Sequence, residues 1–307
     1  MSINVKTIVF FILLPFFTGC DGFLNSEDDD YPPPDFIYVE YYYPVISPDG
    51  ESIAFFWSKI QYIDSGYHFT DYDSSGIWIA DLTNRTRRML YHIDGILPVK
   101  MEYSPDGEYL HFSTLRIRIA DGMLEQLPID GGGGDIALSN DGEWLVFKRD
   151  IYLFGSERPV IHYANVDGTV LRTITVNDSH LMGTDPDWFP DCSRIVFSNA
   201  ERSIVSIDTS GENYTILFDE DIPCTVSPTV SPNGELIAFV FDSYIYRMNA
   251  DGSDLLCISP RYGLYPVWSA DGEKLIYISG AEDPEYQNQN SIWMMNPDGT
   301  DARQVVP

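Results

Sequence analysis

The sequence predicts an all-β protein, a six-bladed β-propeller made of four-stranded antiparallel blades. A motif of apolar strand, tight turn and apolar strand recurs six times in the 307 residues. Each copy precedes a second pair of segments that alternate apolar and polar residues, so each repeat supplies four strands. From Pro44 to Pro266 the copies cover 222 residues in five steps, about 44 residues each, the size of one propeller blade.

Every copy of the first motif except the fourth has Asp-Gly or Asn-Gly at its turn. These pairs are the strongest short-range signal of a β-hairpin, because the turn requires positive φ. The fourth copy has Asp191-Cys192 instead, which predicts a distorted turn in blade four. The six copies are PVISPDGESIAFF from Pro44, MEYSPDGEYLHFS from Met101, IALSNDGEWLVFK from Ile136, PDWFPDCSRIVFS from Pro186, PTVSPNGELIAFV from Pro228 and PVWSADGEKLIYI from Pro266.

The second hairpins complete the blades, and six blades occupy residues 36–307. The strand Ala302 to Val306 completes blade six, and Phe36 to Tyr42 is predicted as an extra strand at the closure of the ring. The second hairpins are GIWIADLTNRTRRML from Gly76, RIRIADGMLEQL from Arg116, VIHYANVDGTVLRTI from Val160, SIVSIDTSGENYTIL from Ser203, YIYRMNADGSDLLCI from Tyr244 and SIWMMNPDGTDARQVV from Ser291.

The repeats share Ser-Pro-Asp-Gly turns followed by Ile-Ala-Phe-like strands, and two of the turns are preceded by Trp188 and Trp268. Together these features resemble the TolB-like β-propeller repeat. The resemblance covers nearly all of residues 36–307 and implies a closed ring of six blades. The chain departs from TolB itself, which carries an additional N-terminal α/β domain and is a soluble periplasmic protein. The resemblance therefore implies the fold and not the role of TolB in the Tol–Pal system.

Residues 1–19 are predicted to be a lipoprotein signal peptide. Lys6 gives a positive start, and Ile8 to Phe17 is an apolar run of ten residues, too short to span a bilayer. The end of the run, Phe17-Thr18-Gly19-Cys20, resembles the bacterial lipobox, which implies cleavage before Cys20 and acylation of that residue. The alternative is a plain secretory signal. The lipid anchor predicts a protein of the bacterial cell envelope that faces the periplasm.

Residues 20–35 are predicted to tether the propeller to this anchor. The acidic run Glu27 to Asp30 extends the segment by charge repulsion, and Pro32 to Pro34 stiffen it. Asp21 resembles the residue that favours inner-membrane retention in enterobacterial lipoproteins, whereas the acidic run resembles surface-export signals. The sequence leaves the choice between inner and outer membrane open.

The composition is strongly acidic, with 18 Lys and Arg against 47 Asp and Glu and a net charge of −29. Such a surface repels nucleic acid and anionic lipid headgroups, which excludes nucleic-acid binding. It favours basic partners or cations, or serves only as a solvated surface.

The sequence contains no recognised catalytic or metal-binding motif. G-x-S-x-G and H-E-x-x-H are both absent, and the Asp-Gly turns lack the glycine and glutamate spacing of a calcium loop. Cys192, Cys224 and Cys257 are odd in number and far from the histidines, which predicts neither a disulfide framework nor a zinc site. We therefore expect no cofactor, no metal and no enzymatic activity.

Three insertions fall on the face formed by the loops between strands two and three, at Ser58 to Ser75, Asp150 to Pro159 and Gly280 to Asn290. Blades six and one become neighbours when the ring closes, so their insertions should form one raised surface. Exposed aromatic side chains on loops suit recognition, although they can also pack their own loops. The candidate binding residues are Tyr62, Tyr67, His68, Phe69, Tyr72 and Tyr286.

Two functional hypotheses follow. In the first, the propeller is a non-catalytic scaffold that binds a protein or peptide partner, or a ligand, at the envelope. In the second, it is an envelope polysaccharide lyase or hydrolase that uses channel-facing carboxylates and histidines, and the loop residues His68, His92 and His180 are candidates to reach the channel. His111 and His162 lie within strand patterns and are expected in the core.

Overall fold

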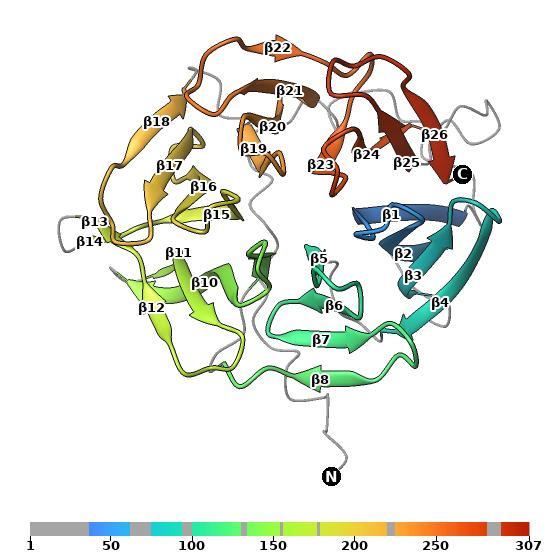
Figure 1. The fold of residues 1–307 in the computed structure, drawn as a ribbon, viewed down its shortest axis with the longest axis horizontal. Coiled ribbons are helices and arrows are strands. Elements are labelled where there is room, and N and C mark those ends of the chain that lie inside the picture. The colour runs from blue at the N-terminus through green and yellow to red at the C-terminus, as the bar shows by residue number, and fades with distance from the viewer. Residues whose placement is uncertain are drawn as a thin grey trace.

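The computed structural model describes residues 37–61, 75–93, 100–129, 134–153, 156–176, 179–219, 225–280 and 290–306. Figure 1 shows six four-stranded sheets arranged as a ring around a central channel. All neighbouring strands within these sheets are antiparallel. The predicted fold class is therefore confirmed. No helix in these ranges is long and apolar enough to cross a membrane.

Each blade uses four consecutive strands, with the first strand beside the channel and the fourth at the rim (Figure 1). A two-stranded hairpin, β13 and β14, lies between blades three and four. The strands are β1 Ile37–Ile46, β2 Ser52–Gln61, β3 Gly76–Asp81, β4 Thr86–His92, β5 Met101–Tyr103, β6 Tyr109–Phe112, β7 Leu115–Arg118, β8 Leu124–Gln126, β9 Gly134–Leu138, β10 Trp144–Leu153, β11 Ser156–Asn165, β12 Leu171–Thr173, β13 Thr175–Val176, β14 Ser179–His180, β15 Gly183–Trp188, β16 Arg194–Asn199, β17 Ile204–Asp208, β18 Thr215–Phe218, β19 Thr225–Val230, β20 Leu236–Phe241, β21 Tyr244–Asn249, β22 Leu256–Cys257, β23 Leu264–Trp268, β24 Leu275–Gly280, β25 Asn290–Met295 and β26 Arg303–Val306.

In the repeated Ser-x-Asp-Gly motif, the Ser and Asp side chains form hydrogen bonds with backbone amides at the first turn of the blade. In blade one the Ser47 hydroxyl donates to Asp49 Oδ1 (2.6 Å) and accepts from the Ser52 amide (2.9 Å). Asp49 Oδ1 also accepts from the Glu51 amide at 3.0 Å. The same three bonds recur in four other blades, and in blade five Asn233 replaces the aspartate.

Blade four shows that the prediction of a distorted turn at Cys192 was wrong. Cys192 takes a φ of 57°, and its amide donates to the Phe189 carbonyl at 2.9 Å, as the glycines do at the equivalent turns. In four of the other five blades the turn glycine lies near a proline of the preceding blade: a Cβ on Gly142 would lie 3.0 Å from Pro105 Cδ. In blade three Asn140 occupies the position of that proline, so the turn of Cys192 follows a blade that lacks it.

Within the part of the chain that the structure describes, the ring closes without a strand shared between its ends, so the prediction of an extra strand at Phe36 to Tyr42 was wrong. The described part of that segment belongs to β1, the innermost strand of blade one. The Tyr41 amide donates to Asn290 Oδ1 (2.8 Å), and Asn290 Nδ2 donates to the Tyr41 carbonyl (3.1 Å). One side chain of blade six thus pairs with the backbone of blade one, above an apolar core that includes Phe55 and Ile278.

The tryptophans that precede two of the turns connect neighbouring blades. Trp188 Nε1 donates to the Ala137 carbonyl and Trp268 Nε1 to the Thr229 carbonyl, both at 3.2 Å. Each indole is buried and reaches the inner strand of the preceding blade. Burying a tryptophan with its N–H satisfied combines a large apolar contact with a fixed orientation between blades.

Replacing Cys192 with glycine should raise the free energy of unfolding by about 1 kcal/mol, because a side chain in the left-handed region costs about that much and glycine does not. Denaturant titration of purified protein measures the change. Gly234→Cys is the matched control: its new Cβ would lie 3.2 Å from Pro190 Cδ, so this variant should be destabilised. Equal stability of wild type and Cys192→Gly would contradict the strain that we assign to this turn.

Candidate functional site

The inner strands of five blades carry a β-bulge at a corresponding place. The register between strands one and two shifts beside residues 43, 135, 185, 227 and 265. At each shift one non-glycine residue has a positive φ, and four of the five directly precede a proline. The φ values are 47° for Tyr43, 23° for Asp135, 52° for Asp185, 55° for Ser227 and 53° for Tyr265.

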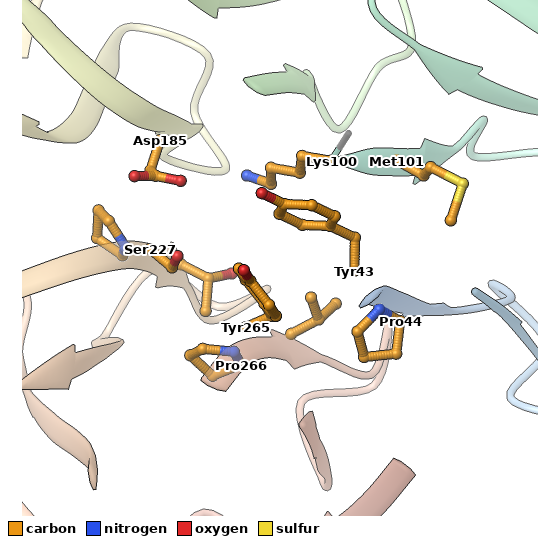
Figure 2. A pocket seen from close by; sticks show the side chains of 11 residues that line it. Tyr43, Pro44, Lys100, Met101, Asp185, Ser227, Tyr265 and Pro266 are labelled. Atoms are coloured by element: carbon orange, nitrogen blue, oxygen red, sulfur yellow. The ribbon is translucent and has the colours of Figure 1, made fainter. Parts of the chain in front are cut away.

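These residues and Lys100 of blade two surround the channel, and we call the six together the channel ring: Tyr43, Lys100, Asp135, Asp185, Ser227 and Tyr265. Figure 2 shows the Lys100 amine and the Tyr43 hydroxyl converging near the Asp185 carboxylate, with Ser227 and Tyr265 opposite. A bulge re-aims a side chain, which explains why the five blades that have one direct a residue of the inner strand toward the channel. The channel ring is the candidate site.

The pocket at the channel ring is narrow. It contains about 360 Å³ of space between atoms, partly open to solvent, but its cavity volume is only about 20 Å³, which suits one water molecule. The rings of Tyr43 and Tyr265 lie 4.3 Å apart at 43° and form one wall. Met101 and Val267 add apolar surface. A partner can therefore place a single small group here, unless the side chains move.

Lys100 is the central cation of the site. Its ammonium donates to the Pro186 carbonyl of blade four at 3.1 Å and lies 3.7 Å from Glu102 Oε1. The two side chains are only 14% and 23% exposed. Burial alone would lower the pKa of Lys100, but the surrounding carboxylates, Asp187 first, outweigh it and raise that pKa. Lys100 is thus charged and joins blade two to blade four.

Two carboxyl groups at the channel titrate near neutral pH. Burial raises the pKa of Glu102 to about 7, against the opposing effect of Lys100. Burial, and then the charge of Asp135, raises the pKa of Asp185 to about 6. Carboxyl groups with raised pKa values are characteristic of functional sites, although ion-pair networks also produce them. Among the described residues no group of three or more His, Cys, Asp or Glu could hold a metal ion.

The predicted loop site cannot be compared with the structure. Tyr62, Tyr67, His68, Phe69, Tyr72 and Tyr286 all lie outside the described residues, as does Cys20.

The described residues that flank the insertions of blades one and six lie close together. Ser58 and Ser75, at the ends of the blade one insertion, have their hydroxyl oxygens 3.4 Å apart. Asn290, at the end of the blade six insertion, bonds to Tyr41, which pairs with Trp57 next to Ser58. The two insertions therefore start from one seam of the ring.

The four histidines within the described ranges, His92, His111, His162 and His180, do not converge on the channel. His92 ends β4 at the rim and His180 lies in the hairpin β14, so the expectation that these two could reach the channel was wrong. Both are exposed because they lie in or after the outermost strand of a blade. His111 and His162 are buried in strands, as predicted, and burial lowers the pKa of His111 to about 4.

Sequence reasoning missed the channel ring, although a signal was present. Four copies of the motif begin at a proline, and the residue before that proline is the one aimed into the channel. The residues in question are Tyr43, Asp185, Ser227 and Tyr265. A residue before proline is normally extended, so nothing local predicts its positive φ.

Comparison with known proteins finds the fold but no close relative. No family model and no curated protein matches the chain in sequence. TolB from Acinetobacter baumannii has a TM-score of 0.59 at 17% identity, over 85% of this chain and 61% of TolB. The fold is that of the TolB propeller. This chain therefore covers less than two thirds of that TolB, and the resemblance concerns the fold alone.

Propellers of different activities also match. Oligogalacturonate lyase in complex with manganese has a TM-score of 0.57 at 14% identity, over 88% of this chain and 78% of the lyase. A chain of the nidogen/laminin complex has a TM-score of 0.57 at 16% identity, over 75% of this chain and 90% of its own length. Since a lyase and a chain from a protein complex fit about equally well, the fold does not select the function.

At pH values above the normal titration range of aspartate, Asp185→Asn should increase the free energy of unfolding. The folded-state pKa of about 6 exceeds the unfolded value of 3.8, so wild-type stability is lost as pH rises between these values. Asparagine carries no charge, so the variant should gain on the order of 2 kcal/mol at neutral pH and little near pH 4. Denaturant unfolding at both pH values measures this difference. Asp271→Asn, where the Ser269 hydroxyl lowers the pKa, is the control and should show no such gain.

Proposed function

We propose that this chain is a non-catalytic binding module of the bacterial cell envelope. Acylated Cys20 anchors it, residues 20–35 extend it into the periplasm, and the propeller binds a protein or peptide partner, or a ligand, at the channel ring. The observation that carries the proposal is the set of four non-glycine residues with positive φ that line one pocket, namely Tyr43, Asp185, Ser227 and Tyr265. Incorporation of labelled palmitate into wild type, and its absence from Cys20→Ala, would test the anchor.

The strain in the channel ring supports a functional role. A non-glycine residue in the left-handed region costs about 1–2 kcal/mol, and such residues persist chiefly at functional sites. The propeller does not require them, since blade two forms its inner strand beside Lys100, which is not among the residues with positive φ. The strained conformations therefore serve to aim side chains.

The chemistry of the channel favours a cationic group on the partner. The carboxyl groups of Glu102, Asp135, Asp185 and Asp187 surround Lys100 and outnumber it. The tilted pair Tyr43 and Tyr265 adds aromatic surface, which attracts cations through the ring quadrupole. An ammonium group from a lysine side chain or an amine suits this combination, because the narrow cavity has room for one group of about the size of a water molecule.

Photo-crosslinking in native envelopes tests whether the channel contacts a partner. Benzoylphenylalanine at Tyr265 should form a specific adduct, because that side chain lines the pocket. The control places the same group at Tyr152, which is 74% exposed and lies in the part of β10 beyond the residues that pair with β9. Identical adducts from the two positions, or none from Tyr265, would argue against a binding site in the channel.

The second candidate is a lyase or hydrolase that acts on envelope or external polysaccharide. The raised pKa values of Asp185 and Glu102 favour it, because a general acid or base works best with a pKa near the operating pH. The carboxyl groups whose charges act on Lys100 support this candidate, whereas the described histidines do not.

An enzyme assay separates the two candidates. As a binding module the protein should release no product from oligogalacturonate or from other oligosaccharides, with or without added manganese. Ultraviolet absorbance detects unsaturated ends, and a reducing-sugar assay detects hydrolysis. Turnover that is abolished in Asp185→Asn, with folding intact, would replace the binding proposal by the enzymatic one.

A further inference from the structure

Blade two meets the channel differently from the other five blades. Its inner strand, β5, has three residues and pairs with β6 in unbroken register, so it carries no bulge. Lys100 directly precedes β5 and does not have a positive φ. The other blades use a bulge to bring a side chain of the inner strand to the channel, whereas blade two uses a long, unbranched side chain. The channel ring therefore has one member whose reach comes from its own side chain.

The Lys100 side chain occupies space between the inner strands of blades two and four. Figure 2 shows it extended past the Tyr43 hydroxyl toward Asp185. Its ammonium donates to the Pro186 carbonyl at 3.1 Å, and only 14% of the side chain is exposed. Because Lys100 lines the pocket at the channel ring, the cavity volume of about 20 Å³ that remains there depends on where this side chain lies.

Carboxyl groups around Lys100 are held in place by other parts of the chain. Asp187, whose charge acts most strongly on Lys100, accepts a hydrogen bond from the Val230 amide at 2.8 Å. Asp135 lies 3.8 Å from the Lys148 ammonium. Both acids have these partners without Lys100, so the channel would still attract a cation if the Lys100 side chain were shortened.

The room left beside Lys100 distinguishes two kinds of cation. An ammonium group is compact, about the size of the one water molecule that the cavity accommodates. A guanidinium group is planar and carries three nitrogen atoms, so it needs more space than this cavity has. Both groups carry one positive charge, so the net charge of the carboxyl groups alone does not separate them. A preference between the two must come from the shape of the site.

We propose that Lys100 is the residue that determines which cation the channel ring accepts. Its side chain leaves room for an ammonium group and excludes a guanidinium group, so the site selects a lysine side chain or an amine over an arginine side chain. The selection rests on the proposed function, which brings a cationic group to the channel ring, and adds a choice between two such groups. A purely structural role for Lys100, as a link between blades two and four, predicts no selection of this kind.

The test compares methylammonium with methylguanidinium, which differ only in the charged group. Isothermal titration of each into the full chain gives two dissociation constants, at about pH 8 so that the carboxyl groups of Glu102 and Asp185 are ionised. Wild type should bind methylammonium more tightly. Lys100→Ala removes three methylene groups and the ammonium, and should shift the ratio of the two constants toward methylguanidinium by about tenfold.

Lys100→Met is the matched control, because it keeps an unbranched side chain of similar length and removes the charge. It should strengthen the binding of both cations and change the ratio of their dissociation constants by less than about twofold. Thermal unfolding in the presence of each cation gives a second measurement. Methylguanidinium should raise the unfolding temperature of Lys100→Ala more than methylammonium does, even if this variant is less stable than wild type.

Two results would overturn the selection by Lys100 and leave the proposed function in place. One is the same ratio of dissociation constants in wild type and Lys100→Ala, with methylammonium bound by both. The other is an equal shift of the ratio in Lys100→Met, which would assign the selection to charge. If none of the three proteins binds either cation, the selection is overturned together with the cationic ligand of the proposed function.

Discussion

Closure of the ring between blades six and one is the constraint on which the other features of this protein depend. Each blade leaves two apolar faces that only its neighbours can cover, so an open row of six would expose the cores at both ends. Asn290 joins the ends by pairing its amide with the Tyr41 backbone in place of a shared strand. The channel ring exists only because this seam brings Tyr43 of the first blade against Tyr265 of the last.

The inner strands of the ring carry features that lower the stability of the protein. Apolar packing and satisfied turns hold the blades, whereas the inner strands carry strained backbones and carboxyl groups that resist burial. Lys100 offsets part of this cost by reaching across to the Pro186 carbonyl. Backbone strain also occurs at turns away from the channel, as at Cys192, whereas the carboxyl groups of Glu102 and Asp185 place their cost at the inner strands.

The blades were predictable from the sequence, and the site was not, for different physical reasons. Strand and turn signals are local and recur six times, so a copy with an unusual sequence can be assigned from the other five. The channel ring depends on contacts between distant blades, such as Lys100 with Pro186, which no single repeat encodes. The turn at Cys192 keeps the regular hydrogen bond to the Phe189 carbonyl with a positive φ, which the Asp191-Cys192 pair alone does not predict. The candidate loop residues remain predictions.

The pairing of Asn140 with Cys192 means that these repeats are no longer interchangeable units. In most blades a proline of one turn lies beneath the glycine of the next, so a duplicated blade would fit any position. Blades three and four have left that common pattern together, and each is now matched to the other. At the turns of Gly142 and Gly234 a side chain would place its Cβ only 3.0 or 3.2 Å from a proline Cδ, so blade four would not fit these two places without a shift, and the order of the blades has become part of what the sequence specifies.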